Sequence, residues 1–446
     1  MGRLFGTDGV RGRAGTFPLD EPMVTRLGAA LVRALGHGHA AVRFLAGRDT
    51  RESGEWIERA LAVGISSQGG SLTSAGVIPT PAIAYLTPRM GFTAGVVISA
   101  SHNPFEDNGI KVFSGAGEKF TEILEREVEA IIDDPSWSVD GGSPAVETQD
   151  LRGAYIEHLR EILQGSFPPS FSVAIDCANG ATVTVAPRVF EALGLETAIV
   201  GAEPDGRNIN LACGSTHPEH LARTVVNGKH DLGIAYDGDG DRAIFVDERG
   251  RIVDGDAVML MCAKQMQREG RLRGNTVVAT VMSNIGLELA LREAGIDMVR
   301  TAVGDKHVME EMLRQDFPIG GEQSGHVIFS DYLFTGDGIA TSLNVLRTMA
   351  ATGRSLGDLA GELTTFPQVL LNVRVQERFD LRTVPSIAAA LDEVESRLAG
   401  HGRLLVRYSG TEPLLRVMLE GRDVDEIRRW GQEIVDAVQA HAPVQA

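Results

Sequence analysis

The sequence predicts an α/β protein of four domains, in which three related mixed α/β domains precede a smaller C-terminal α+β domain. Three observations lead to this fold class. The chain has 446 residues, which corresponds to three or four domains at roughly 150 residues per domain. Three stretches repeat one order of strand, polar loop and helix. The final stretch has a different order, which is typical of an antiparallel sheet with helices.

Each repeated stretch begins with a run rich in β-branched residues, which gives way to helical spacing after a short polar loop. In the second and third stretches a glycine ends the helix and another strand follows. Such units indicate parallel or mixed sheets. The predicted strands, loops and helices cover 42–47, 49–53 and 55–68; then 171–176, 179–180, 185–193 and 197–200; then 276–281, 283–284, 287–294 and 298–300.

In the C-terminal stretch, a strand and a helix are followed by two strands and a second helix. We expect strands at 369–375, 402–407 and 415–420, and helices at 384–398 and 424–440. This order predicts a small antiparallel sheet. With boundaries placed in stretches rich in proline, glycine and aspartate, the predicted domains are 1–150, 151–252, 253–366 and 367–446.

Composition restricts the class of partner. The net charge is -18 at pH 7, which argues against non-specific binding to nucleic acid or to an anionic membrane. No apolar run has the length of a membrane span, and the N-terminal residues do not resemble a signal peptide. Cys177, Cys213 and Cys262 are far apart in the sequence, so we expect reduced thiols that behave as small buried hydrophobic side chains. These features predict a cytoplasmic protein.

The first chemical motif is Ser-His-Asn-Pro, which follows an apolar strand that ends near residue 98. Because proline stops the strand, the motif lies on a loop at the strand end. A hydroxyl at such a position suits nucleophilic or phosphoryl-carrier chemistry, although a turn held by serine and asparagine side chains has the same composition. On local sequence alone, Ser99 and Ser101 are equal candidates.

The second motif places Asp237, Asp239 and Asp241 at alternate positions between two apolar strands. Three close carboxylates repel one another unless a cation neutralises them, and carboxylate oxygens are ligands for hard divalent cations. An EF-hand is excluded because Arg242 occupies the position that requires glycine and because strands, not helices, flank the motif. The Asp-x-Asp nucleophile of haloacid dehalogenase phosphatases is a weak alternative, since no threonine follows.

The third motif is a glycine-flanked loop that presents Glu322, Gln323, Ser324 and His326. Carboxylate and hydroxyl groups in such a loop suit hydrogen bonds to sugar hydroxyls. A polar turn between strands is the plainer alternative.

The fourth motif is a Ser-Gly-Thr turn with an arginine on each side. Backbone N–H groups in such a turn form an anion nest, and arginine adds a planar fork of donors that matches phosphate oxygens. The sequence has no Gly-Lys-Ser or Gly-Lys-Thr phosphate loop. The predicted phosphate-binding residues are Arg407, Ser409, Gly410, Thr411 and Arg416.

Together with a glycine-rich N-terminal segment, these motifs in this order resemble the loops of the α-D-phosphohexomutase superfamily across essentially the whole chain. The resemblance implies that superfamily's four-domain architecture. The matching segments are Thr7-Asp-Gly-Val-Arg11-Gly, Ser99-Ala-Ser101-His-Asn-Pro, Asp237-Gly-Asp-Gly-Asp-Arg242, Gly321-Glu-Gln-Ser-Gly-His326 and Arg407-Tyr-Ser-Gly-Thr-Glu-Pro413.

The resemblance implies a role for each motif. Ser101, and not Ser99, is the serine that carries the phosphoryl group, and it shares one Mg²⁺ per chain with the three aspartates. The loop at 321–326 binds sugar hydroxyls, and the turn at 407–413 holds the phosphate that does not react. The implied residues are Ser101, Arg11, Lys111 and His326 for catalysis; Ser101, Asp237, Asp239 and Asp241 for the metal; and His102, Arg242, Glu322 and Ser324 for the substrate.

Within the superfamily, the chain is most similar to the branch that interconverts glucosamine 6-phosphate and glucosamine 1-phosphate, as Gln323 and the segment from Cys213 to His217 indicate. The branch implies a glucosamine or glucose 1,6-bisphosphate as intermediate and activator, a possible homodimer and a role in amino-sugar nucleotide synthesis. The alternative is the phosphomannomutase/phosphoglucomutase branch. A calcium- or sugar-binding protein without turnover is a rival of another class. We assign no role to His307 and expect a buried structural histidine there.

Overall fold

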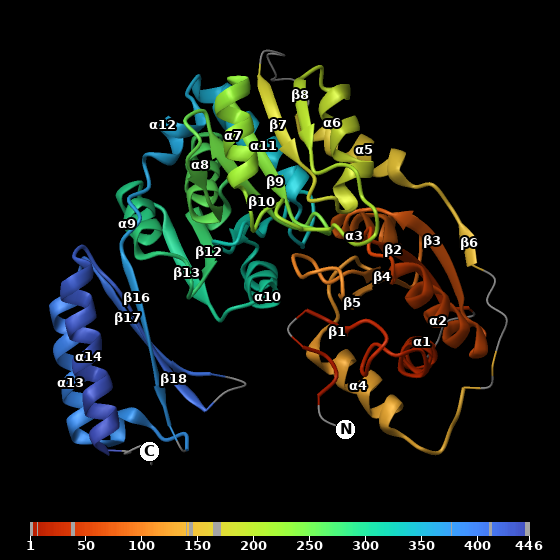
Figure 1. Ribbon diagram of the computed structural model, residues 1–446, viewed down its shortest axis with the longest axis horizontal. Coiled ribbons are helices and arrows are strands. Elements are labelled where there is room, and N and C mark those ends of the chain that lie inside the picture. Colours follow the sequence, from red (N-terminus) through yellow and green to blue (C-terminus); the bar gives the residue numbers. More distant parts are fainter. Residues whose placement is uncertain are drawn as a thin grey trace. The chain divides into compact units, whose positions relative to one another are not determined.

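The computed structural model describes residues 3–6, 8–36, 41–139, 141, 146–163, 171–375, 377–409 and 413–441. These residues form four sheets, and Figure 1 labels most of their strands. By compactness the chain forms two units, Met1–Met282 with Ile296–Glu362, and Ser283–Gly295 with Leu363–Ala446. We describe each unit by itself.

The first sheet has six strands in the order β1-β5-β4-β2-β3-β6, with helices on both faces. Glycines in the strands let helix α3, Thr80–Arg89, pack closely against this sheet. A Cβ at Gly47 would lie 2.6 Å from Ile83, and one at Gly95 would lie 2.4 Å from Thr87. The strands are β1 Val10–Arg13, β2 Arg43–Arg48, β3 Ser71–Val77, β4 Ala94–Ile98, β5 Asp107–Ser114 and β6 Val146–Thr148, and the helices are α1 Glu21–Leu35, α2 Gly54–Ser67, α3 Thr80–Arg89 and α4 Glu122–Asp133.

The second sheet has five strands in the order β11-β10-β9-β7-β8. Its central strands β7 and β9 are almost entirely buried. The strands are β7 Ser172–Asp176, β8 Glu196–Val200, β9 Leu232–Tyr236, β10 Ala243–Asp247 and β11 Ile252–Val253; the helices are α5 Arg152–Glu161, α6 Ala186–Ala192 and α7 Glu219–Gly228, with a 3₁₀ turn at Ala181–Thr184.

The third sheet has four strands in the order β13-β12-β14-β15. Its strands are β12 Thr276–Thr280, β13 Asp297–Thr301, β14 Ile319–Gly321 and β15 Val327–Phe329. The helices of this segment within the first unit are α8 Gly255–Arg268, α10 Asp305–Gln315, α11 Gly338–Thr352 and α12 Leu356–Ala360, and a 3₁₀ turn spans Arg273–Asn275.

These three sheets share one four-strand arrangement. The orders β3-β2-β4-β5, β8-β7-β9-β10 and β13-β12-β14-β15 correspond strand for strand. In each, the first three strands are parallel, and the fourth pairs antiparallel with the third. The sequence expectation of three related mixed α/β segments is therefore confirmed. In each segment, the last two of the four shared strands form an antiparallel pair joined by a loop.

The second unit contains the antiparallel sheet β16-β18-β17 and three helices. Helix α9 belongs to this unit because its N-terminal residue Asn284 exchanges hydrogen bonds with the backbone of Phe366 at 2.9 and 3.0 Å, and Glu420 accepts from Ile285 N at 3.0 Å. The elements are α9 Ile285–Glu293, β16 Gln368–Arg374, α13 Pro385–Leu398, β17 Arg403–Tyr408, β18 Leu414–Glu420 and α14 Val424–His441, with a 3₁₀ turn at Leu381–Thr383.

Several helices begin at residues whose side chains satisfy free backbone donors. The carboxylates of Asp20, Asp254 and Asp337 each accept a hydrogen bond from the backbone N–H three residues later, at the start of α1, α8 and α11. Over the part of the chain that the structure describes, no helix is both long and apolar enough to cross a membrane.

Candidate active site

Three of the predicted loops occupy equivalent positions in the three related sheets. The loop with Ser101 joins β4 to β5, the aspartate loop joins β9 to β10, and the loop with Glu322 joins β14 to β15. All three reach one cavity of about 560 Å³ within the first unit. Its lining includes Arg11, His102, Asp241, Arg242, Glu322 and His326.

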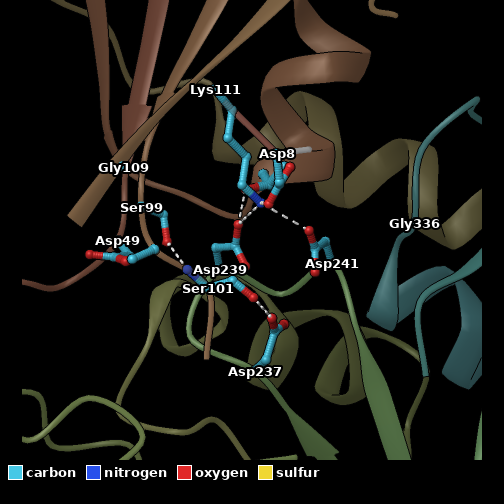
Figure 2. Close-up of polar contacts among 12 residues, drawn as sticks. Asp8, Asp49, Ser99, Ser101, Gly109, Lys111, Asp237, Asp239, Asp241 and Gly336 are labelled. Atoms are coloured by element: carbon cyan, nitrogen blue, oxygen red, sulfur yellow. Dashed lines mark hydrogen bonds and ion pairs between the residues drawn. The ribbon is translucent and has the colours of Figure 1, made fainter. Parts of the chain in front are cut away.

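Ser101 has a geometry unlike that of the neighbouring Ser99. Its φ is 54°, in the left-handed region, and its Oγ donates a hydrogen bond of 2.5 Å to Asp237 Oδ2 (Figure 2). The hydroxyl also lies 3.3 Å from His102 Nδ1. Ser99 Oγ instead donates to Asp49 at 2.5 Å and accepts from the Ser101 N–H at 2.9 Å. The geometry therefore favours Ser101 as the reacting hydroxyl.

The three predicted aspartates form a compact buried cluster. Asp237, Asp239 and Asp241 each offer a carboxylate oxygen, and these oxygens lie within 4.8 Å of one another. Oδ1 of Asp239 and Oδ1 of Asp241 are buried without a hydrogen-bond partner among the described residues. Burial, with repulsion from Asp241 and Asp239, raises the pKa of Asp237 well above its ordinary value. Buried carboxylate oxygens that accept no hydrogen bond, beside a serine hydroxyl, fit a hard divalent cation such as Mg²⁺.

Lys111 supplies the nearest positive charge to this cluster. Its Nζ lies 2.8 Å from Asp239 Oδ2 and 3.1 Å from both Asp241 Oδ2 and Asp8 Oδ2, as Figure 2 shows. Burial works against the charged ammonium, but the three carboxylates raise the pKa of Lys111 well above its ordinary value. Lys111 therefore remains protonated, and Arg11 adds a second cation through its ion pair with Asp8.

The sequence analysis missed the residues that connect Lys111 to the third sheet. Lys119 Nζ lies 2.6 Å from Asp8 Oδ1 and also pairs with Asp305. Asp305 Oδ2 lies 3.3 Å from His326 Nε2. Asp8 stands in the glycine-rich N-terminal segment, whereas Asp305 and Lys119 belong to none of the motifs. Thr80 was also missed, although its Oγ1 donates to Asp239 Oδ2 at 2.6 Å.

His326 and His102 occupy different electrostatic settings. The His326 ring is buried between Asp241 and Asp305, and the Gly336 N–H donates to its Nε2 at 3.0 Å. His102 lies beside cations, with Nδ1 3.4 Å from Arg242 Nη1. Burial, together with Arg242 and Arg11, lowers the pKa of His102. Both rings reach the cavity, so both are able to contact a bound substrate.

The loop between β14 and β15 places its polar side chains in different settings. Glu322 lines the cavity, and its Oε1 accepts a hydrogen bond of 3.2 Å from Gly304 N. Ser324 is exposed at the turn and does not line this cavity. The Gln323 amide points elsewhere, because its Nε2 donates to Asp254 Oδ2 at 3.0 Å. Gln323 thus secures its loop to the start of α8.

The predicted phosphate-binding residues lie in the second unit. Arg407 on β17 and Arg416 on β18 are direct cross-strand partners, so their side chains share one face of the sheet. Ser409 follows β17 and is buried, and its N–H donates to Leu414 O at 2.8 Å. Gly410 and Thr411 lie outside the described residues.

Two expectations about single residues need correction. His307 is not buried: its side chain is 49% exposed on α10, where it lies 3.8 Å from Glu310. An exposed face of an amphipathic helix explains its lack of a partner in the core. Cys177 and Cys262 are buried free thiols as expected, but Cys213 is only half-buried.

Sequence profiles of one family match the chain in four consecutive segments. They describe the phosphoglucomutase/phosphomannomutase α/β/α domains I, II and III, at 2–138, 153–250 and 254–366, and the C-terminal domain at 370–437. The chain is also 48% identical to a phosphoglucosamine mutase of Syntrophotalea carbinolica over 99% of this chain and 98% of that protein. It is 46% identical to the phosphoglucosamine mutase of Caldicellulosiruptor bescii, with 99% of each chain covered.

Solved structures share the fold at much lower identity. A phosphoglucomutase/phosphomannomutase family protein of Burkholderia thailandensis superposes with a TM-score of 0.82 at 23% identity, covering 100% of this chain and 98% of that one. N-acetylphosphoglucosamine mutase of Aspergillus fumigatus, solved with GlcNAc-6P and magnesium, gives a TM-score of 0.68 at 19% identity, covering 98% and 96%.

Proposed function

Because this chain belongs to the phosphoglucomutase/phosphomannomutase family, we propose that it is a phosphoglucosamine mutase, which interconverts glucosamine 6-phosphate and glucosamine 1-phosphate. The observation that carries the proposal is the buried Ser101 hydroxyl, which faces the aspartate cluster at the edge of a cavity lined by three loops. Full-length similarity to phosphoglucosamine mutases supports the choice of an amino sugar.

In the first half-reaction, Ser101 carries a phosphoryl group that is transferred to the free hydroxyl of glucosamine 6-phosphate. The bond between phosphorus and Ser101 Oγ breaks as a bond forms between phosphorus and the sugar oxygen. We propose that His326, whose ring lines the cavity, carries the proton that the sugar hydroxyl loses, while Lys111, which three carboxylates hold protonated, stabilises charge. The product of this step is a 1,6-bisphosphate.

The charges on the transferring group need stabilisation throughout. When bound by the three aspartates and Ser101, Mg²⁺ supplies positive charge to the phosphoryl oxygens, at one ion per chain. Lys111 and Arg11 contribute fixed positive charge from the side of the first sheet. Thr80 holds Asp239 in place, which keeps the ligand set in a single geometry.

In the second half-reaction, the bisphosphate turns by about half a turn and returns its other phosphoryl group to Ser101. We propose that Glu322 and Ser324 bind the sugar hydroxyls, with His102 and Arg242 beside the reacting phosphate. Arg407, Ser409, Gly410, Thr411 and Arg416 hold the phosphate that does not react. Since such a nest binds only phosphate, it serves both orientations of the intermediate. A glucosamine or glucose 1,6-bisphosphate then acts as activator by phosphorylating Ser101.

We also propose the domain boundaries 1–150, 151–252, 253–366 and 367–446, which the gaps between the four matched segments support. A cytoplasmic location is supported by three cysteines that are all free thiols. The expected homodimer stays a prediction that sedimentation velocity would test.

The test is a comparison of kcat/KM for glucosamine 6-phosphate, glucose 1-phosphate and mannose 1-phosphate, with a trace of bisphosphate activator. A strong preference for the amino sugar places the enzyme in the supply of glucosamine 1-phosphate for amino-sugar nucleotides. Preference for glucose or mannose phosphate keeps the residues and assigns the chain to the phosphomannomutase/phosphoglucomutase branch. Binding without turnover on any of the three contradicts the proposal and favours a sugar-binding protein.

A further inference from the structure

A buried arginine, Arg51, donates hydrogen bonds to the main chain of the loop that carries Ser101. The Arg51 side chain is completely buried, and its guanidinium donates to the backbone carbonyls of three residues of the loop, Ser101, Asn103 and Pro104. Nη2 lies 3.0 Å from Ser101 O and 2.9 Å from Asn103 O, and Nη1 donates to Pro104 O. The remaining donor, Nε, pairs with Asp49 Oδ2 at 2.9 Å. One planar group therefore fixes three carbonyls relative to the end of β2.

A second donor reaches two of these carbonyls from the connection between β8 and α7. Asn210 Nδ2 donates to Ser101 O at 2.9 Å and to Asn103 O at 3.1 Å. The Asn210 residue is itself buried, with φ of 58°, and its N–H donates to Ala178 O at 2.9 Å. Each of the two loop carbonyls is therefore held by donors from two separate segments of the chain.

The amide of Ser101 is held as firmly as its carbonyl. Ser101 N donates to Ser99 Oγ at 2.9 Å, and Ser99 Oγ donates to Asp49 Oδ2 at 2.5 Å, as Figure 2 shows. The same Asp49 oxygen accepts from Arg51, so the contacts form a closed ring around the Ser101 backbone. A serine avoids the left-handed conformation unless its surroundings impose it. Here both backbone polar groups of Ser101 are fixed by buried partners.

With its backbone fixed, the Ser101 side chain has little freedom of direction. The Oγ faces Asp237, and a Cβ at Gly238 would lie only 2.4 Å from Ser101 O, so the aspartate loop approaches the serine backbone closely. A relaxed backbone at Ser101 would turn both the carbonyl and the hydroxyl away from these partners. Lysine is a poor substitute for Arg51, because one ammonium lacks the planar fork that reaches three carbonyls and a carboxylate.

We propose that Arg51 is a positioning residue, assisted by Asn210, that holds Ser101 in the left-handed conformation and thereby aims its Oγ at the metal cluster. This inference rests on the proposed function, in which Ser101 carries the phosphoryl group. It predicts that loss of the hydrogen bonds from Arg51 and Asn210 slows phosphoryl transfer more than it weakens substrate binding, since the substrate-contacting side chains remain.

The test compares Arg51→Lys with a control on helix α1, which packs in the same α/β segment. Arg26 also donates to three main-chain carbonyls, with Nε 2.7 Å from Ile132 O, Nη1 3.1 Å from Trp137 O, and Nη2 bonded to Asp134 O. We expect Arg51→Lys to lower kcat by about 100-fold with KM for glucosamine 6-phosphate changed less than threefold. Arg26→Lys should lower the melting temperature but leave kcat within about twofold of wild type.

Asn210→Gly provides a second variant, because glycine accepts the positive φ at this position while removing the amide donor. We expect a kcat loss of about tenfold and slower single-turnover transfer from phosphorylated enzyme, with the phosphorylated fraction still measurable by intact mass. An unchanged kcat in both Arg51→Lys and Asn210→Gly, or a kcat loss in Arg26→Lys equal to theirs, overturns the inference. If Arg51→Lys does not fold, the Asn210→Gly result decides. Absence of phosphoserine or turnover in the wild type contradicts the proposed function instead.

Discussion

Ser101 shows how much of a reactive site depends on a single side chain. It is buried, its backbone is left-handed, and its hydroxyl lies 2.5 Å from Asp237, one of three clustered carboxylates. A serine in such a place has no structural need for its hydroxyl in the core, since alanine would fill the space of its methylene. The hydroxyl is therefore best explained by a role in the reaction.

Ser101→Ala tests this assignment directly. The purified wild-type protein should contain a fraction heavier by one phosphoryl group, and the variant should lack it because no acceptor oxygen remains. Turnover should fall by ~10³-fold or more. Intact-mass spectrometry and a coupled assay measure both effects. Ser99→Ala is the matched control, and it should retain the added mass; full turnover in Ser101→Ala would disprove the assignment.

Asp239→Asn tests the metal cluster. The substitution preserves size but removes one negative charge from the carboxylates around the cation, so the Mg²⁺ concentration for half-maximal activity should rise by ~10–100-fold and kcat should fall. Titration of activity with Mg²⁺ measures the change. Asp425→Asn, at an exposed helix start, serves as control. A titration curve that coincides with that of the wild type would contradict the metal assignment.

At the scale of single elements, Asp337 at the start of α11 is a buried carboxylate with a distinctive environment. Its Oδ1 accepts from Ala340 N at 2.9 Å and its Oδ2 from Tyr155 OH at 2.7 Å. Burial raises its pKa from 3.8 to about 6. The folded state therefore binds more protons than the unfolded state between about pH 4 and pH 6, and stability falls as the pH rises through this window.

Asp337→Asn should remove this pH-dependent loss, because asparagine caps the helix without a charge. At pH 7.5 the free energy of unfolding should increase by about 2–3 kcal/mol, and near pH 4 it should change little. Urea unfolding at several pH values measures it. Tyr155→Phe, which removes a donor that lowers the pKa of Asp337, should move the stability loss to higher pH. Parallel pH profiles for wild type and Asp337→Asn would contradict the prediction.

The strands and helices of the repeats were predictable because their signals are local. The expected strand at 171–176 corresponds to β7 Ser172–Asp176, and the expected helix at 424–440 corresponds to α14 Val424–His441. The place of α9 was not predictable, since it depends on Asn284 bonding to Phe366, 82 residues later. Periodicity reports burial of a face but not which partner covers it.

The site was predictable only in part, for the same reason. Ser101, the aspartate cluster and Glu322 stand in short motifs, whereas Arg51, Lys119 and Asn210 act through contacts that join distant segments. No local pattern distinguishes such a buried cation from a solvated one. Gln323 correctly marks the subgroup in sequence, but its hydrogen bond to Asp254 joins residues 69 positions apart and was not predictable from its motif.

At the scale of the molecule, the Lys119 ammonium links the first and third sheets. It pairs with Asp8 from the first and with Asp305 from the third, and its side chain is 9% exposed. Lys119→Met leaves two carboxylates without this partner, so the free energy of unfolding should fall by about 3–5 kcal/mol. Denaturant unfolding measures the loss. Lys119→Arg should lose far less, and equal stability of Lys119→Met and wild type would contradict the prediction.

The repeated connection between the third and fourth strands of each sheet also matters for protein engineering. Phosphoryl carriage, metal binding and sugar contact are each assigned to a different copy of this connection, between β4 and β5, β9 and β10, and β14 and β15. Both strands around each turn are largely buried and hold the turn in register. We therefore expect that exchanging the turn at 322–325 for that of a relative, with His326 kept, would change sugar preference while the turns proposed to carry the phosphoryl group and the metal stay unchanged.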